Sequence, residues 1–373
     1  MNFALKNNIN ELQPKLKVKK IAYIEIDTHA EIAQDFIEIM QDSHEFEVDY
    51  YFSQRIKNQI KESKENIFLS DSSMIMDQLK IKKYDLIIIG TVHRYFNTFQ
   101  AVTEKFNTSI IIHNINFTNI SKTDLIKNVL KNDMIYRLKL WWKEGLFYSS
   151  KVYKKAKNLL VLDQELASGK YKFLPLFYTK NIQNSENKVL KIVIPGGVSQ
   201  MRRDYKRVFS NIRKWENDLR QGLNSGNKLI EFIFLGKADG QELREIVDLE
   251  KSLERISITY FSERVSQNDF EKWMREADVL WCPIQQETEF FSQKEIYGTT
   301  KMTGNLGDAI KYGKLAVFPK NYPSKLDFII PENDNLMEQF IQLKNINFDF
   351  QKNYNKKLVQ ENLEKILSNQ IES

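Results

Sequence analysis

The segment Lys294–Pro319 combines lysines, glycines and a carboxylate in an order that suits a phosphate-bearing ligand. It predicts a polar loop, a short helix that begins near Gly304, a stop at Gly313 and a buried strand, Leu315–Phe318. A helix that begins in a glycine-rich turn offers free backbone N–H groups and the positive end of its dipole to an anion. The alternative interpretation is an ordinary connection between a helix and a strand, ended by a glycine cap.

The start of this predicted helix contains the candidates for binding a diphosphate, which are Lys301, Thr303, Gly304 and Asn305. Lys301 comes just before the helix, where its ammonium group can reach a phosphate. Asp308 lies one turn further on, where a carboxylate can accept hydrogen bonds from ribose or sugar hydroxyls.

A second cationic loop follows the predicted strand Val189–Ile194. Gly197 allows the backbone to approach a ligand closely, and Arg202 and Arg203 supply positive charge next to it. The spacing matches neither a dinucleotide fingerprint nor a P-loop. Since ligands bind at the carboxyl ends of parallel strands, we expect this loop and Lys301 to form one diphosphate site. A glycine turn before a solvated basic helix face is the alternative.

Three of the four histidines, His29, His93 and His113, directly follow predicted strands. Histidines at one sheet edge can act as general bases or as orienting donors. His93 follows the most apolar strand of the first half, so we expect it to be the catalytic histidine ahead of the other two. Zinc is the alternative, but the chain has neither an HExxH motif nor a cysteine near these histidines. It also lacks an Asp-x-Asp pattern, so no metal is expected.

Apolar runs alternate with helical patterns along both halves of the chain, which indicates βαβ units and parallel sheets. The expected strands are Lys19–Ile26, Phe46–Phe52, Tyr84–Ile89, Ser109–His113, Asn158–Leu162, Val189–Ile194, Leu229–Leu235, Ile256–Phe261, Val279–Ile284 and Leu315–Phe318. Gln285–Tyr297 is expected to be a long functional loop. The sequence therefore predicts an α/β protein with two Rossmann-like domains, residues 1–180 and 181–334. C-terminal helices in residues 335–373 could pack back on the first domain.

Length and composition limit the classes of function. A chain of 373 residues is expected to form two domains of ordinary size. The net charge of +6 suits an anionic ligand, but no nucleic-acid-binding signature appears, so nucleic acid is not an expected partner. No apolar run approaches the ~18 residues of a membrane span, no signal peptide is recognised, and the lone Cys282 excludes an intrachain disulfide. Together these features predict a cytoplasmic protein.

Residues 137–157 form a basic aromatic stretch that contains adjacent tryptophans, Trp141 and Trp142. Its cations are Arg137, Lys139, Lys143, Lys151, Lys154, Lys155 and Lys157. Such a stretch can lie on an anionic membrane surface, which would place the protein on the inner face of the membrane. A core helix with a solvated basic face is the alternative.

The second half resembles the nucleotide-sugar domain of GT-B glycosyltransferases, in particular families 1 and 4, and the first half resembles them more loosely. The resemblance is carried by Val189–Lys206, Phe232–Gly236, Ile258–Phe261, Phe270–Pro283, Gly307–Val317 and, in the first half, Tyr84–His93. It implies that Asp308 takes the place of a ribose-binding glutamate and that Arg203 and Lys301 hold the donor diphosphate. Thr300 stands where the retaining branch often has a second glutamate, and Glu295 is the candidate to replace it.

The resemblance implies a metal-independent glycosyltransferase with a nucleotide sugar as co-substrate and no further cofactor. The donor would bind the second domain and a glycan or lipid-linked acceptor the first. Two alternatives remain open, namely a nucleotide-sugar epimerase of the same fold and a catalytically silent assembly protein. The configuration at the transferred carbon is also open.

Overall fold

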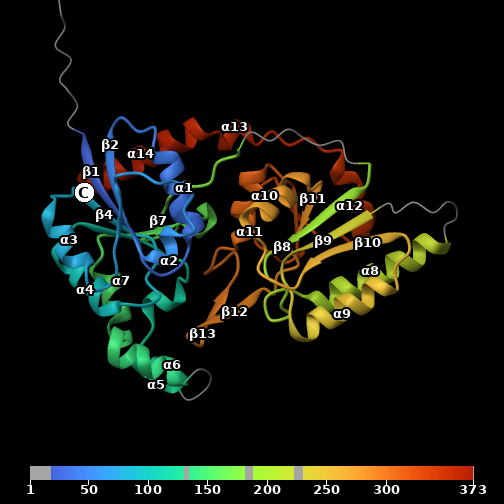
Figure 1. Ribbon diagram of the computed structural model, residues 1–373, viewed down its shortest axis with the longest axis horizontal. Coiled ribbons are helices and arrows are strands. Elements are labelled where there is room, and N and C mark those ends of the chain that lie inside the picture. Colours follow the sequence, from blue (N-terminus) through green and yellow to red (C-terminus); the bar gives the residue numbers. More distant parts are fainter. Residues whose placement is uncertain (1–17, 130–133, 181–187, 222–229, 373) are drawn as a thin grey trace, which may run out of the picture.

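The computed structural model describes residues 18–129, 134–180, 188–221 and 230–372, which form two α/β domains lying side by side (Figure 1). The first domain contains a seven-stranded parallel sheet in the order β3-β2-β1-β4-β5-β6-β7. Its strands are β1 Lys19–Glu25, β2 Phe46–Phe52, β3 Ile67–Leu69, β4 Leu86–Ile89, β5 Thr108–Ile111, β6 Asn158–Val161 and β7 Tyr171–Phe173.

The second domain contains a six-stranded parallel sheet in the order β10-β9-β8-β11-β14-β15. Its strands are β8 Leu190–Pro195, β9 Ile230–Lys237, β10 Ile256–Phe261, β11 Val279–Trp281, β14 Ala316–Phe318 and β15 Ile329–Pro331. The predicted pair of parallel sheets is confirmed. In each sheet the strand order reverses beside the first strand, at β1/β4 and at β8/β11, and such points are where open α/β sheets form ligand sites.

Helices cover both faces of each sheet, which explains why strands such as β4 are buried along their whole length. In the first domain the helices are α1 Ala30–Met40, α2 Gln54–Lys57, α3 Ile75–Ile81, α4 Phe96–Lys105, α5 Lys122–Val129, α6 Met134–Lys139 and α7 Ser149–Lys155, with short turns η1 Asn116–Asn119, η2 Leu140–Glu144, η3 Leu146–Tyr148 and η4 Gln164–Leu166. Those of the second are α8 Tyr205–Gln221, α9 Gly240–Lys251, α10 Gln267–Glu276, α11 Gly304–Tyr312 and α12 Leu336–Lys344. No described helix has the length and apolar character needed to span a membrane.

The C-terminal segment is divided between the domains. Helix α12 packs on the second sheet, where the ring of Phe340 lies 5.5 Å from that of Trp281. After α13 (Gln351–Tyr354), helix α14 (Lys356–Glu372) returns to the first domain and packs against α1 (Figure 1). There Ser109 Oγ donates a hydrogen bond of 2.6 Å to Gln370 Oε1. The expected third segment, residues 335–373, therefore belongs to both domains.

The segment that was expected to be a long loop forms an antiparallel hairpin, β12 (Glu287–Phe290) and β13 (Gln293–Ile296). The hairpin leaves the second domain and reaches the first (Figure 1). Glu295 on β13 accepts hydrogen bonds from the backbone N–H groups of Phe117 (3.0 Å) and Asn116 (3.3 Å) in η1. The hairpin therefore links the two domains along one edge of the space between them.

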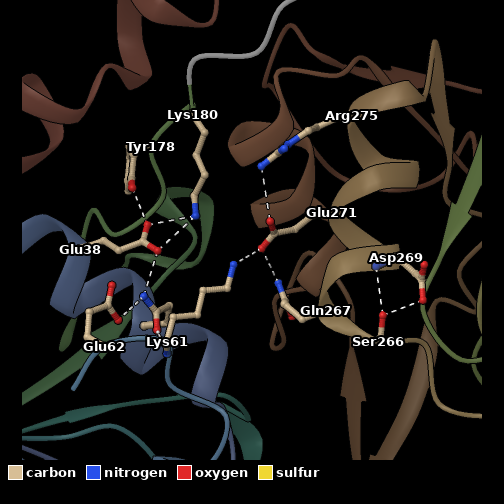
Figure 2. Close-up of polar contacts among 11 residues, drawn as sticks. Glu38, Lys61, Glu62, Tyr178, Lys180, Ser266, Gln267, Asp269, Glu271 and Arg275 are labelled. Carbon is tan, nitrogen blue, oxygen red and sulfur yellow. Dashed lines mark hydrogen bonds and ion pairs between the residues drawn. The ribbon is translucent and has the colours of Figure 1, made fainter.

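A second group of contacts links the domains through α1, the α2 region and α10 (Figure 2). Lys61 of the first domain forms an ion pair with Glu271 on α10. Beside this pair, Glu38 on α1 accepts hydrogen bonds from Tyr178 and Lys180 in the segment that leaves the first domain. The two domains are thus held together on two sides of the space between them.

Candidate functional site

A cavity of about 540 Å³ lies between the domains, where the carboxyl ends of β1, β4 and β5 face the start of α11. Its polar lining from the first domain includes His29, Glu31, His93, His113 and Asn114. The second domain contributes Arg202, Arg203, Lys301, Thr303, Gly304, Asp308 and Lys311. The cavity therefore has histidines on one wall and mostly cations on the other.

A buried glutamate shapes the turn that carries His29. Glu25 ends β1 and is fully buried, and its Oε1 accepts hydrogen bonds of 3.1 Å from the backbone N–H groups of Asp27 and Thr28. Its Oε2 accepts a hydrogen bond of 2.7 Å from Thr91 Oγ1, which follows β4. Burial raises the pKa of Glu25 to about 8. This turn leaves His29 in the left-handed region (φ 63°), immediately before α1.

His29 is paired with the carboxylate of Glu31, in the first turn of α1. Nδ1 of His29 lies 2.8 Å from Oε1 of Glu31, and because a carboxylate only accepts, this nitrogen carries the proton. Nε2 then presents a lone pair that no described residue occupies with a hydrogen bond. Burial opposes a charged imidazole, but the hydrogen bond and the charge of Glu31 outweigh it, so the pKa of His29 is raised. The pKa of Glu31 falls to about 2 because pairing with His29 outweighs its own burial.

His113 stacks on His29, with ring centroids 4.1 Å apart and ring planes 10° from parallel. Its Nε2 lies 2.9 Å from the carbonyl oxygen of Gly90, so this nitrogen donates and is protonated. Burial and the neighbouring His29 lower the pKa of His113 to about 3. His113 is therefore a neutral ring that packs face to face against the ring of His29.

His93 is also held neutral, and one of its nitrogens is occupied. Lys301 Nζ donates to Asn114 Oδ1 at 2.7 Å, which leaves the Asn114 amide group to donate to His93 Nε2 at 3.2 Å. Burial and the nearby His113 lower the pKa of His93 well below its usual value. The ring of Phe290, on the hairpin, covers it at 4.5 Å.

Arg203 is held rigidly at the carboxyl end of β8. Its guanidinium donates to the carbonyl oxygen of Gly197 (3.3 Å) and to Asn305 Oδ1 (3.1 Å), while its buried Nε–H finds no partner among the described residues. Gly196 adopts φ 101°, and a Cβ atom there would lie 2.3 Å from Nη2 of Arg203. A glycine is therefore required for the guanidinium to occupy this position.

The start of α11 is open toward the cavity. Thr303 caps the helix by accepting a hydrogen bond from the backbone N–H of Asn305, and a Cβ atom on Gly304 would meet no atom within 4 Å. Asp308 lies one turn further on, and burial raises its pKa to about 6. The ammonium group of Lys301 lies in the same cavity, where burial lowers its pKa. This arrangement of N–H groups and cations can bind an anion.

Three predicted site residues do not line the cavity, whereas all the others do. Gly197 and Asn305 lie behind the lining and fix Arg203, and the Asn305 amide also donates to the carbonyl oxygen of Pro195 at 3.2 Å. Glu295 is fully buried and binds the N–H groups of η1, as described above. Its carboxylate therefore joins the domains and does not face the sugar position that we expected for it.

Several lining residues were not anticipated. Glu31 and Asn114 each set the protonation of a histidine, and Lys311 of α11 forms a buried ion pair of 2.6 Å with Asp35 of α1. The sequence could have indicated Glu31 as a site residue, because a carboxylate two residues after a histidine at a helix start can reach the histidine ring. It could not have indicated Asn114 and Lys311, since their partners come from other elements. No group of three His, Cys, Asp or Glu side chains among the described residues could hold a metal ion.

No protein-family model matches the sequence, and no curated protein matches it. Several solved structures do. A putative UDP-N-acetylglucosamine 2-epimerase from Listeria monocytogenes aligns with 94% of this chain and 96% of its own, at a TM-score of 0.52 and 10% identity. The lipopolysaccharide outer core galactosyltransferase WaaB and a UDP-GlcNAc 2-epimerase from Neisseria meningitidis each align with 94% of this chain and 99% of their own, at a TM-score of 0.50 and 12% identity.

The protein has the GT-B fold. The likeness extends over both domains and includes their two facing parallel sheets, so the fold expected from the sequence resemblance is confirmed. In this GT-B protein the cavity lies between the carboxyl ends of the two sheets. Identities of 10–12% establish the fold alone, and the reaction has to be argued from the side chains of the cavity.

Proposed function

We propose that the protein is a glycosyltransferase that moves a sugar from a nucleoside diphosphate to an acceptor hydroxyl. One observation carries the proposal: a single cavity holds a His–Glu pair on the wall of the first domain and fixed cations on the wall of the second. A base opposite an anion site is the arrangement that a displacement at a sugar carbon requires.

The donor diphosphate would lie against Arg202, Arg203, Lys301 and the open start of α11. Arg203 and Lys301 are already held in place by hydrogen bonds, so they can stabilise the charge of the leaving diphosphate without a metal ion. Asp308 would accept hydrogen bonds from donor hydroxyls. The support for this placement is that these side chains line one cavity and that Arg203 and α11 are held rigidly.

His29 is the proposed general base. Its Nε2 would take the proton of the acceptor hydroxyl while the acceptor oxygen bonds to the sugar carbon. The bond from that carbon to the diphosphate oxygen breaks, and its electron pair leaves with the diphosphate. His29 is favoured over His93, our first expectation from the sequence, because Asn114 occupies His93 Nε2 and burial keeps that ring weakly basic. Attack from the wall opposite the leaving group would invert the configuration at the sugar carbon.

An epimerase acting on a nucleotide sugar is the second candidate, and the likeness to two 2-epimerases of the same fold favours it. Both reactions would use the same donor site, so nucleotide binding does not separate them. The products do separate them. An epimerase changes the configuration of the sugar while the sugar remains attached to the nucleotide, or it releases the sugar without transferring it to an acceptor.

The test begins with a thermal-shift screen of nucleoside diphosphates and nucleotide sugars, because a ligand that binds only the folded protein raises its melting temperature. The best donor is then incubated with the protein and candidate acceptors, and the products are identified by mass spectrometry. His29→Ala should keep nucleotide binding and lose ~10²–10⁴-fold in turnover, whereas the exposed His44→Ala should behave as wild type. If no nucleotide binds, the proposal is wrong, and binding without any turnover would favour a catalytically silent assembly protein.

A further inference from the structure

The helix formed by α6 and η2 buries two charged residues and exposes several large apolar ones. Its inner face carries the charged residues Arg137 and Glu144, each only 8% exposed, beside the fully buried Leu140. Its outer face carries Ile135, Leu138 and Trp142, which are 82%, 37% and 88% exposed. A surface helix in water normally turns its apolar side inward, and neighbouring exposed apolar side chains of this size mark an interaction site.

The inner charges are bound in place, so the helix cannot simply turn over. Arg94 donates through two nitrogens to the Glu144 carboxylate, with Nε 3.0 Å from Oε2. Arg137 Nη2 donates to Ser292 Oγ, at the hairpin turn, at 2.8 Å. These contacts fix the apolar side of the helix toward the outside.

Behind this helix lies a second cavity of about 380 Å³. Its lining includes Asp27, Arg55, Arg94 and Glu289 together with the rings of Tyr136 and Phe290. Carboxylates and arginines beside aromatic rings are suited to a sugar, since the charged groups bind hydroxyls and the rings cover its apolar faces.

Shared lining residues show how this second cavity is connected. His93, Glu289 and Phe290 line both it and the cavity between the domains, so the two cavities adjoin. Tyr136 lines both it and a surface hollow formed with Met134, Ile135 and Lys139 on α6. The three hollows therefore adjoin one another in sequence, from the proposed donor site to the apolar outer face of α6.

We propose that the acceptor is a glycolipid held in an anionic membrane. Its sugar would occupy the second cavity, with the reacting hydroxyl extending past His93 into the cavity between the domains, where His29 lies. Its lipid would leave past Tyr136 onto the outer face of α6, which would lie in the bilayer surface. The inference rests on the proposed function for the transfer step. The exposed lysines Lys139, Lys143 and Lys151 flank the apolar side chains and suit a negatively charged lipid surface.

Vesicle co-sedimentation at low salt tests the docking surface without any donor. The wild-type protein should pellet with phosphatidylglycerol-containing vesicles, and the double variant Ile135→Glu/Trp142→Glu should lose at least about tenfold in partitioning, because two apolar side chains no longer enter the lipid. The control is Ile81→Glu, the same change at an isoleucine that is 80% exposed on α3, and it should bind as wild type. Equal recovery of wild type and double variant with the vesicles would overturn the inference. Failure of the wild-type protein to sediment with the vesicles would also overturn it, and is the result expected if the partner is a protein.

A second measurement tests the acceptor and separates this inference from the proposed function. A radiolabelled nucleotide sugar that binds the protein is incubated with it and with membranes, and the products are divided between butanol and water. Label in butanol, reduced at least about tenfold by the double variant while nucleotide binding is unchanged, supports a glycolipid acceptor. Label transferred only to water-soluble glycans would overturn the inference and leave the proposed transfer intact. Absence of nucleotide binding would refute the proposed function, whereas the vesicle result would still stand.

Discussion

Replacement of Glu31 by glutamine tests the basis of the proposed reaction, because it removes the charge that makes His29 basic. The side chain keeps its size and can still accept the hydrogen bond from Nδ1 of His29, so the ring should keep its position. What changes is the stability of the imidazolium ion, which the Glu31 carboxylate supports across a distance of 2.8 Å.

The size of the effect follows from the pairing. The pKa of Glu31 lies at about 2 against an ordinary 4.5, and the difference corresponds to about 3.4 kcal/mol at 1.36 kcal/mol per pH unit. The Glu31 side chain is 59% exposed, however, and solvent screening limits such a pair to about 1 kcal/mol. We therefore expect the pKa of His29 to fall by about 0.7 in the variant.

The assay is the pH dependence of kcat/KM for the sugar-transfer reaction, with the best donor and acceptor. A general base must be neutral, so activity is lost as the pH falls through the pKa of His29. Glu31→Gln should move this acid limb to lower pH by about 0.7 and reduce the plateau by at most about fivefold, since a base weaker by this amount accepts the proton less readily. Glu271→Gln, the same change in an ion pair outside the cavity, should leave the acid limb where it is. An acid limb that does not move in Glu31→Gln would refute the assignment of His29 as the base.

Four further outcomes are expected. Lys301→Ala should weaken nucleoside diphosphate binding by about 1.5–3 kcal/mol in calorimetry, because a charge-assisted contact is lost. The control Lys294→Ala, at an exposed position on the hairpin, should leave the affinity unchanged. Unchanged affinity in Lys301→Ala would remove Lys301 from the donor site. Turnover should persist in EDTA, since the fixed cations are proposed to replace a metal, and activity restored only by added manganese or magnesium would contradict this. The transferred sugar should have inverted configuration by NMR, and retention would exclude direct displacement with His29 as base. As the pH rises from 5 to 8, Glu25→Gln should gain thermal stability relative to wild type. Burial raises the pKa of Glu25 to about 8, so the folded wild type binds a proton that the unfolded chain has released above its ordinary pKa of 4.5. The wild type therefore loses stability over this range, whereas the glutamine variant has no such proton to bind. A constant difference in melting temperature between these two proteins across that range would contradict the buried neutral carboxyl.

The sheets could be predicted from the sequence because a strand that is covered on both faces must be apolar at nearly every position. Leu86–Ile89 and Val279–Trp281 are fully buried in the structure, and their apolar runs were visible in the chain. The strand Tyr171–Phe173 was not predicted, since it lies at the edge of its sheet, is only three residues long and is partly exposed. Hydrophobic pattern therefore identified the central strands of both sheets and the six-residue edge strand β10, and it missed the edge strands of only three residues, β3, β7 and β15.

The hairpin of β12 and β13 was missed for a different reason. Phe291 and Ser292 form its turn with φ values of 48° and 56°, a conformation in which glycine or asparagine is usual. Neither residue type is present at the turn, so no local pattern predicted a hairpin. The strain is offset by tertiary contacts that no local pattern records, in particular the stacking of Phe291 on Phe117 at 5.4 Å.

For the candidate site, the sequence could indicate which side chains meet but not what each one does. His29, His93 and His113 follow strands of one parallel sheet, and this alone requires them to lie at the same edge. Their roles depend on which atoms occupy the ring nitrogens. Asn114 and the carbonyl of Gly90 occupy nitrogens of two rings, while Glu31 leaves Nε2 of the third without a partner among the described residues. Since a base needs an unoccupied lone pair and a partner that stabilises its charged form, hydrogen bonding favours His29, whereas strand hydrophobicity had favoured His93.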